Sequence, residues 1–258
     1  NWDSANDARG EPDHTKGPAT FGTPGDFTPA VWETYKSAQE VFLPHAAAPK
    51  AWNEPPPPPP CDSLSAAERT ILERRPAIAM LSKFSGQFST QSILEADGNW
   101  LADQSSNPIW FEMKMNRDEF DTIISARLYN ANVQRERAAA GKGSEVMLRA
   151  GRNTPDPPIM GAIELKAAWR IITDKSDYSK YKMTDAVTVV NGKCTAVKLG
   201  LVGLHIVHKT ESQPQWIWAT FEHVDNAPDK EHAKNPSHPF TFFNPDCKPK
   251  AIPDSCVT

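Results

Sequence analysis

Three histidines, two tryptophans and three acidic residues gather in one short stretch, residues 201–226, with the sequence LVGLHIVHKTESQPQWIWATFEHVDN. The stretch reads as two strands joined by a turn at ESQPQ. A turn centred there places His205 opposite Thr220 and diagonal to Glu222, close enough for an imidazole and a carboxylate to pair. Such a pair is typical of general acid–base chemistry, so we predict His205 and Glu222 as catalytic residues.

The same register divides the hairpin into two faces. The apolar face, which we expect in the core, carries Leu204, Ile206, Ile217, Ala219 and Phe221. The opposite face carries His205, Val207, Lys209, Trp216, Trp218, Thr220 and Glu222. His208 and His223 share the core face but lie several pairs apart, so the three histidines are poorly placed to share one metal ion. We therefore predict no metal site and no cofactor.

A second strand, expected at residues 161–173, adds charge to this picture. Glu164, Lys166 and Arg170 point one way, while the alternate positions are apolar. If this face continues the His205 face, Lys166 and Arg170 can hold an anionic group, and Glu164 with Trp218 completes a substrate-binding cleft. Another expected strand carries Trp110, Glu112 and Lys114 at alternate positions, and these residues can contribute to the same cleft.

Two structural alternatives stay open beside this cleft. An ordinary solvent-exposed sheet face produces the same charged alternation. The tryptophans can also cover the second sheet face beneath proline-rich segments, with His205 as an ordinary buried, hydrogen-bonded residue.

Several other elements are expected around these strands. Thr28 and Pro29 favour a helix that continues to Phe42. Ser65 and Glu68 form a capping signature for a second helix, which Pro76 ends. NPIWFEMKMN alternates as a strand, and Asn116 with Glu119 opens a helix predicted to reach about Ala140. Asn191-Gly192 suits the tight turn of a hairpin.

This order of elements indicates an α+β fold, with a predominantly antiparallel β-sheet or partly closed barrel, a few packed helices and proline-rich arms. We expect a proline-rich N-terminal arm with one helix at 1–62, an α+β core domain at 63–226 and a C-terminal tail at 227–258, all within one compact unit. The 24 prolines gather mainly in the two terminal segments.

The four cysteines, Cys61, Cys194, Cys247 and Cys256, lack the CxxC spacing of zinc knuckles. Three pairings are possible. We favour Cys61 with Cys194 and Cys247 with Cys256, because each bridge would fasten a proline-rich segment to the body. Four buried thiols are the alternative.

Charge and hydropathy exclude some classes of partner. A net charge of -4 with mixed signs gives no electrostatic footprint for nucleic acid. No apolar run approaches the roughly 18 to 20 residues that span a bilayer, so we expect no membrane insertion. The sequence begins at Asn1 without methionine, which we interpret as a processed product.

The motifs VWETYKSAQEVF, IELKAAWRII, VGLHIVHKT and WIWATFEHVDN, together with the opening NWDSANDARGEPD, resemble a family of exported bacterial proteins of undetermined function. Some members look as if they carry c-type cytochrome segments elsewhere. The resemblance implies export to the periplasm or medium and an exported redox partner. This chain has no CxxCH motif, so no haem role is implied for it.

Two function classes follow. The first is a secreted, cofactor-free hydrolase or lyase that acts on a small polar or anionic ligand through the His/Glu/Lys/Arg cleft. The second is a non-catalytic extracellular ligand-binding or redox-accessory domain with the same residues as a recognition surface. A deep pocket at His205 would favour the enzyme, and a flat face would favour the binding domain.

Overall fold

The fold is taken from a computed structural model. It describes residues 8–13, 15, 24–56, 61, 63–73, 77–79, 101–142, 147–153, 159–190, 193–234 and 237–244.

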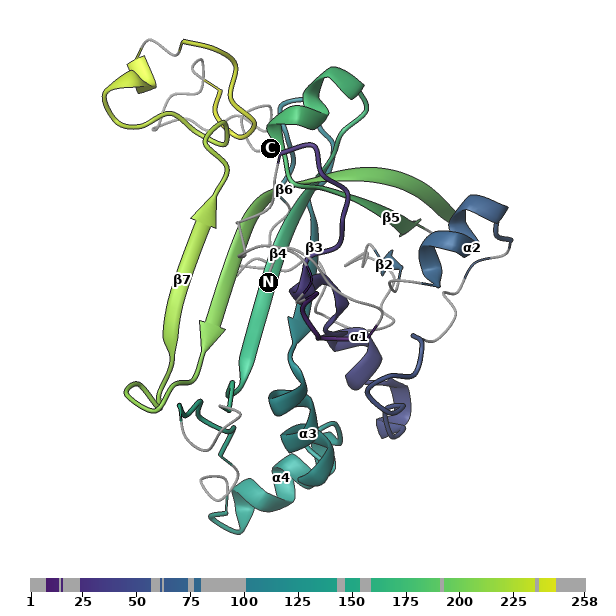
Figure 1. The fold of residues 1–258 in the computed structure, drawn as a ribbon, viewed down its shortest axis with the longest axis vertical. Helices are drawn as coiled ribbons and strands as arrows, with labels where there is room; N and C mark the ends of the chain where they lie inside the picture. Colours follow the sequence, from purple (N-terminus) through teal and green to yellow (C-terminus); the bar gives the residue numbers. More distant parts are fainter. Residues whose placement is uncertain are drawn as a thin grey trace.

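A curled, mainly antiparallel sheet forms the body of the protein, and a few helices lie against it (Figure 1). The predicted α+β class is therefore confirmed. The seven strands are β1 (Lys36–Ser37), β2 (Ile78–Ala79), β3 (Trp110–Met115), β4 (Ile163–Ile171), β5 (Met183–Val190), β6 (Lys193–His208) and β7 (Ile217–Glu222). Within the described ranges the strand order is β1-β3-β4-β6-β5-β2, with β7 also paired to β6, and among these strand pairs only the short β2–β5 pair is parallel.

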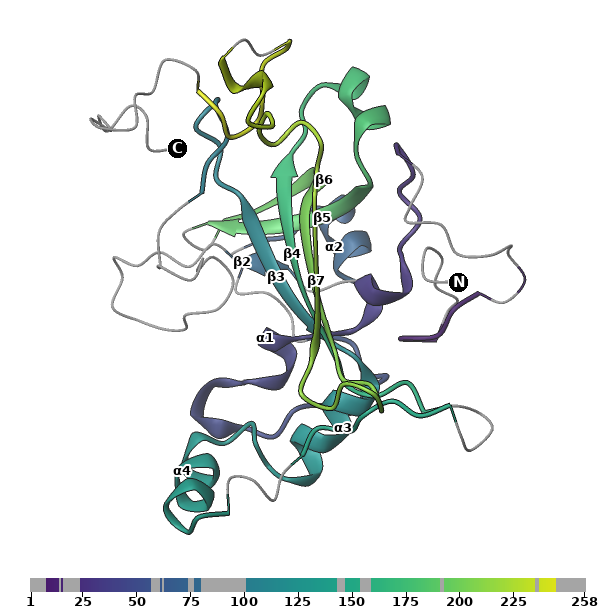
Figure 2. The same cartoon turned by 90° about the vertical axis from the view of Figure 1, so that its left-hand side faces the viewer.

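Strand β6 is the spine of the sheet. It is 16 residues long, and its second half pairs with β4 along one edge. Along its other edge the first half pairs with β5 and the second half with β7. The two halves diverge, so that β5 bends toward α2 (Ala66–Leu72) while β7 stands at the opposite side (Figures 1 and 2).

The N-terminal segment supplies part of the main core. Val31, Trp32, Tyr35 and Trp52 pack with the apolar side of β4, where Trp169 is fully buried. The rings of Trp32 and Trp169 stack with centroids 5.9 Å apart. Burial of such aromatic surface is a large favourable contribution to folding, so this segment belongs to the same hydrophobic core as the sheet.

The helix predicted from Thr28 to Phe42 is wrong. The segment forms a 3-10 turn, η1 (Val31–Thr34), then β1, then one turn of helix, α1 (Ala38–Val41). Valine, threonine and aromatic residues are poor helix formers. Ser37 also starts a new helix, because its backbone N–H donates to the Glu40 carboxylate.

The helix predicted from Asn116 to about Ala140 is two helices, α3 (Arg117–Ser125) and α4 (Ala131–Ala139). Arg127 adopts a positive φ of 56°, which interrupts the helix. Asn130 then caps α4 by accepting from the Asn132 N–H.

Other expectations are confirmed. Ser65 and Glu68 form the capping box of α2. Cys61 and Cys194 form a disulfide, while the predicted Cys247–Cys256 bridge and the Asn191-Gly192 turn lie outside the described residues.

Smaller 3-10 turns are η2 (Pro44–Ala46), η4 (Lys175–Lys180) and η5 (His232–Lys234). None of the helices in the described ranges is long and apolar enough to cross a membrane.

Candidate functional site

The strand register brings most of the predicted site residues to one surface. His205 pairs with Thr220 on β7 and with Lys166 on β4. The hairpin register is the one predicted from the sequence. Residues directly opposite each other share a face. We give the name open face to a set of residues that share one side of β4, β6 and β7: Glu164, Lys166, His205, Trp218, Thr220 and Glu222.

His205 has a different hydrogen-bond partner from the one expected. Its Nδ1 lies 2.7 Å from the hydroxyl oxygen of Thr220. Glu222 occupies the next row, opposite Gly203. A hydroxyl orients the imidazole ring but supplies no negative charge to stabilise an imidazolium, which the predicted carboxylate would have done.

Arg170 is tied into the structure away from a ligand. Its Nε donates to Asp103 at 2.8 Å, and Nη1 donates to the Tyr181 hydroxyl at 3.2 Å. Burial by itself would raise the pKa of Asp103, but hydrogen bonds from Arg170 and Asn107 outweigh it and lower that pKa. The ion pair fastens residues 101–107 to β4.

Lys166 stays on the open face but its ammonium has a local contact. Nζ lies 4.7 Å from the centroid of the Phe111 ring, a cation–π geometry. Both cations predicted to hold an anion are thus engaged with other groups of the protein.

Trp218 is the most exposed aromatic group of this surface. Its residue surface is 71% exposed, because β7 is an edge strand that pairs only with β6 in the described part of the chain. Exposed tryptophan on a regular sheet offers a rigid, flat contact surface.

One expected burial and one expected face assignment are wrong. Ile217 and Phe221, expected in the core, are 43% and 44% exposed, because β7 stands beyond the helices that cover the sheet. The face opposite the open face is buried, and it carries Trp110, Glu112 and Lys114. These three residues of β3 pair with Trp169, Ala167 and Leu165 of β4 respectively.

The carboxyl group of Glu164, on the open face, acts electrostatically on the carboxyl group of Glu119 in α3. Glu119, in the first turn of α3, is buried, and its Oε2 has no hydrogen-bond partner. Burial and the nearby Glu164 raise the pKa of Glu119 to about 8. Burial also raises the pKa of Glu164. The sequence predicts only a helix-capping role for Glu119, because residue spacing carries no information about burial.

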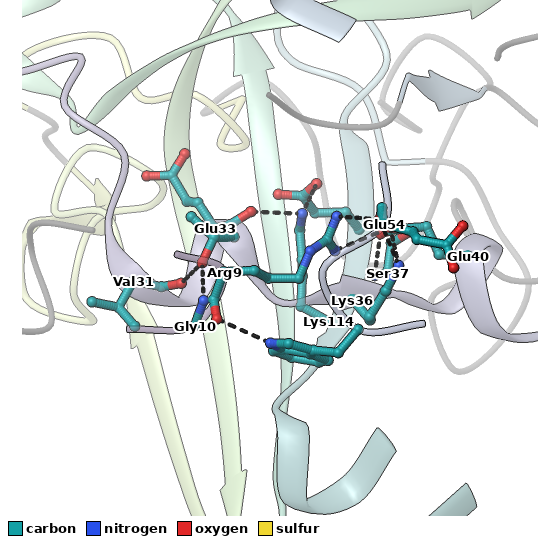
Figure 3. Close-up of polar contacts among 12 residues, drawn as sticks. Arg9, Gly10, Val31, Glu33, Lys36, Ser37, Glu40, Glu54 and Lys114 are labelled. Carbon is teal, nitrogen blue, oxygen red and sulfur yellow. Dashed lines mark hydrogen bonds and ion pairs between the residues drawn. The ribbon is translucent and has the colours of Figure 1, made fainter. Parts of the chain in front are cut away.

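A cluster of buried charges crosses the other face of the sheet (Figure 3). Glu40 accepts from Arg9 at 3.0 Å and from Lys36 at 3.2 Å. Lys114 donates to the backbone carbonyl of Glu33 at 2.8 Å. Burial raises the pKa of Glu40, yet the cations around it outweigh that effect and hold it below its usual value. These contacts fix the N-terminal segment against β3.

The other two histidines of residues 201–226, His208 and His223, have different hydrogen-bond partners. Nε2 of His208 lies 2.8 Å from the carbonyl oxygen of Met160, beside a cavity of about 480 Å³ near the β6–β7 turn. Nε2 of His223 lies 2.8 Å from the Lys180 carbonyl oxygen, and its ring stacks on Tyr181.

Comparison with protein-family models, curated proteins and solved structures found no match. The resemblance to exported bacterial proteins stays a prediction.

Proposed function

We propose that the protein is a non-catalytic recognition domain that binds a neutral, polyhydroxylated ligand, such as an oligosaccharide, on its open face. The observation that carries this proposal is the exposed Trp218 ring on a regular sheet surface, with the polar groups of Thr220, His205 and Glu222 beside it. An aromatic plane provides apolar contact, and the adjacent polar groups provide hydrogen bonds and orientation.

The arrangement of cations favours a neutral ligand over an anionic one. Arg170 is ion-paired with Asp103, and Lys166 lies over Phe111. An anion would have to displace the Asp103 carboxylate from Arg170, whereas the Lys166 ammonium keeps its charge but is held over the Phe111 ring. A sugar needs an apolar plane and paired donors and acceptors, which the Trp218–Thr220 region supplies.

The contacts of His205 favour binding over acid–base catalysis. Its ring is exposed and bonded to a neutral hydroxyl, whereas a general base works best with an orienting carboxylate in a water-excluding pocket. The hydrolase or lyase hypothesis predicts turnover of the bound ligand. Incubation of each bound oligosaccharide with the protein, followed by product analysis, distinguishes the two.

The disulfide between Cys61 and Cys194 is typical of an oxidising compartment. We propose that the protein is secreted or periplasmic, because a protein in these locations has access to external polysaccharides.

Calorimetric titration with cellohexaose, maltohexaose and chitohexaose tests the proposal. We expect saturable binding of at least one of them, and Trp218→Ala should weaken it about tenfold. Val224→Ala is the matched control, since Val224 is 81% exposed just beyond β7 and outside the open face. Equal weakening by both variants, or no binding of any neutral oligosaccharide, contradicts the proposal.

A further inference from the structure

The outer edge of β7 is a second feature of this strand, separate from the face that carries Trp218. The described residues place β7 beside β6 only, and Figure 2 looks directly onto its other edge, where no described segment crosses it. The strand contains no proline, and its only charged residue is Glu222 at the end. Proteins usually block such edges with charges, prolines or bulges.

The unpaired backbone groups of β7 can be assigned. The His223 N–H donates to the Val202 carbonyl, so it points toward β6. Groups alternate along an antiparallel strand. The N–H and C=O groups of Trp218, Thr220 and Glu222 therefore point outward.

We infer that this edge pairs with the β7 of a second copy of the chain, antiparallel about a two-fold axis at Ala219. The pairing sets Trp218 opposite Thr220 of the other copy, and both present outward hydrogen-bonding groups. It also sets Ile217 opposite Phe221 of the other copy, twice, on the face away from Trp218. The two partly exposed apolar side chains then cover each other.

Charge favours this partner and this register. Glu222 of one copy meets Trp216 of the other. The Lys209 ammonium lies 5.1 Å from the centroid of that Trp216 ring, on the same face of the sheet. Each copy therefore brings one carboxylate to the other's lysine. Within a single copy these residues lie at opposite ends of the β6–β7 pairing, because Glu222 is opposite Gly203 and Lys209 follows His208.

The pairing of two β7 strands does not depend on a bound ligand, but it changes the surface that a ligand would meet. Pairing at this edge joins the two sheets, so the open faces of the two copies become one surface with both Trp218 rings near the axis. An isologous contact of this kind is closed and produces dimers, not fibres.

Sedimentation equilibrium of the full chain over a wide concentration range tests the pairing. We expect a reversible monomer–dimer equilibrium. Glu222→Lys and Lys209→Glu should each shift it toward monomer by about tenfold or more in the dissociation constant, and the double variant should restore the dimer. Val224→Lys, which changes an exposed residue outside the strand, should leave it unchanged.

Restoration by the double variant can arise only between copies, because the two residues are remote within one chain. Amide exchange gives a second reading. The outward amides of Trp218, Thr220 and Glu222 should become protected as concentration rises, while circular dichroism reports that each variant is folded. A protein that is monomeric at every attainable concentration, or a dimer that Glu222→Lys leaves intact, overturns the inference.

Discussion

Burial raises the pKa of the Glu119 carboxyl well above its ordinary value. Glu119 has a pKa of about 8 in the folded protein, against an ordinary value of 4.5. Because the folded-state pKa is the higher one, the folded protein favours the protonated carboxyl. The contribution of the protonated Glu119 carboxyl to the free energy of unfolding is complete below pH 4.5 and is lost as the pH rises to about 8.

The variant Glu119→Gln should remove this pH dependence. Glutamine keeps the size of a protonated glutamate and cannot ionise, so the variant should gain stability over the native protein as the pH rises from 4.5, with the full gain reached at about pH 8. Each unit of pKa difference corresponds to about 1.4 kcal/mol, and the expected gain is a few kcal/mol. Urea unfolding at acidic and alkaline pH measures it.

Glu136→Gln is the control, since Glu136 is exposed on α4. It should leave the pH profile of the unfolding free energy unchanged. If Glu119→Gln and the native protein lose stability in parallel as pH rises, the carboxyl does not titrate as described.

At the scale of elements, the Cys61–Cys194 disulfide fastens α2 to the sheet. Cys61 and the partly buried Leu64, Ile71 and Leu72 pack against Val187 and Cys194 of β5 and β6. The bridge joins residues 133 positions apart in the sequence, so it strongly restricts the unfolded chain.

Replacing both cysteines by alanine should lower the free energy of unfolding by about 2–5 kcal/mol. Urea denaturation followed by circular dichroism provides the value. Near-identical midpoints for the variant and the native protein would show that α2 is held by packing alone.

The sequence predicted the β6–β7 hairpin well because its alternation is strict and a shift of one residue would reverse every side chain. It could not predict that Ile217 and Phe221 stay partly exposed, because alternation shows which side a residue faces but not what covers that side. The same limit explains Lys114, whose charge suggested a surface although its contacts lie in the N-terminal segment. Arg170 was placed correctly on β4, but its partner Asp103 is remote in sequence.

At the scale of the whole molecule, the N-terminal segment is held by both apolar packing and the charge cluster of Figure 3. Glu40 joins Arg9 and Lys36 from two parts of that segment. Removing one partner of a buried ionic network leaves the others without compensation, which costs more than losing a surface pair.

Glu40→Ala should therefore lower the free energy of unfolding by about 3–5 kcal/mol. Glu54→Ala is a matched control: Glu54 contacts Lys36 through its backbone carbonyl, which the substitution keeps, and its carboxylate is exposed. We expect a loss of about 1 kcal/mol or less for the control. Equal losses would place the strength of the segment in its packing.

The measurement that tests the recognition proposal most directly is a two-dimensional NMR titration that follows the tryptophan indole N–H signals while the tightest-binding neutral oligosaccharide is added. We predict that the indole signal of exposed Trp218 shifts in a saturable way, with amide changes at Thr220 and His205, while the signal of fully buried Trp169 stays in place. Saturable binding that leaves Trp218 unperturbed and moves signals elsewhere would contradict the account.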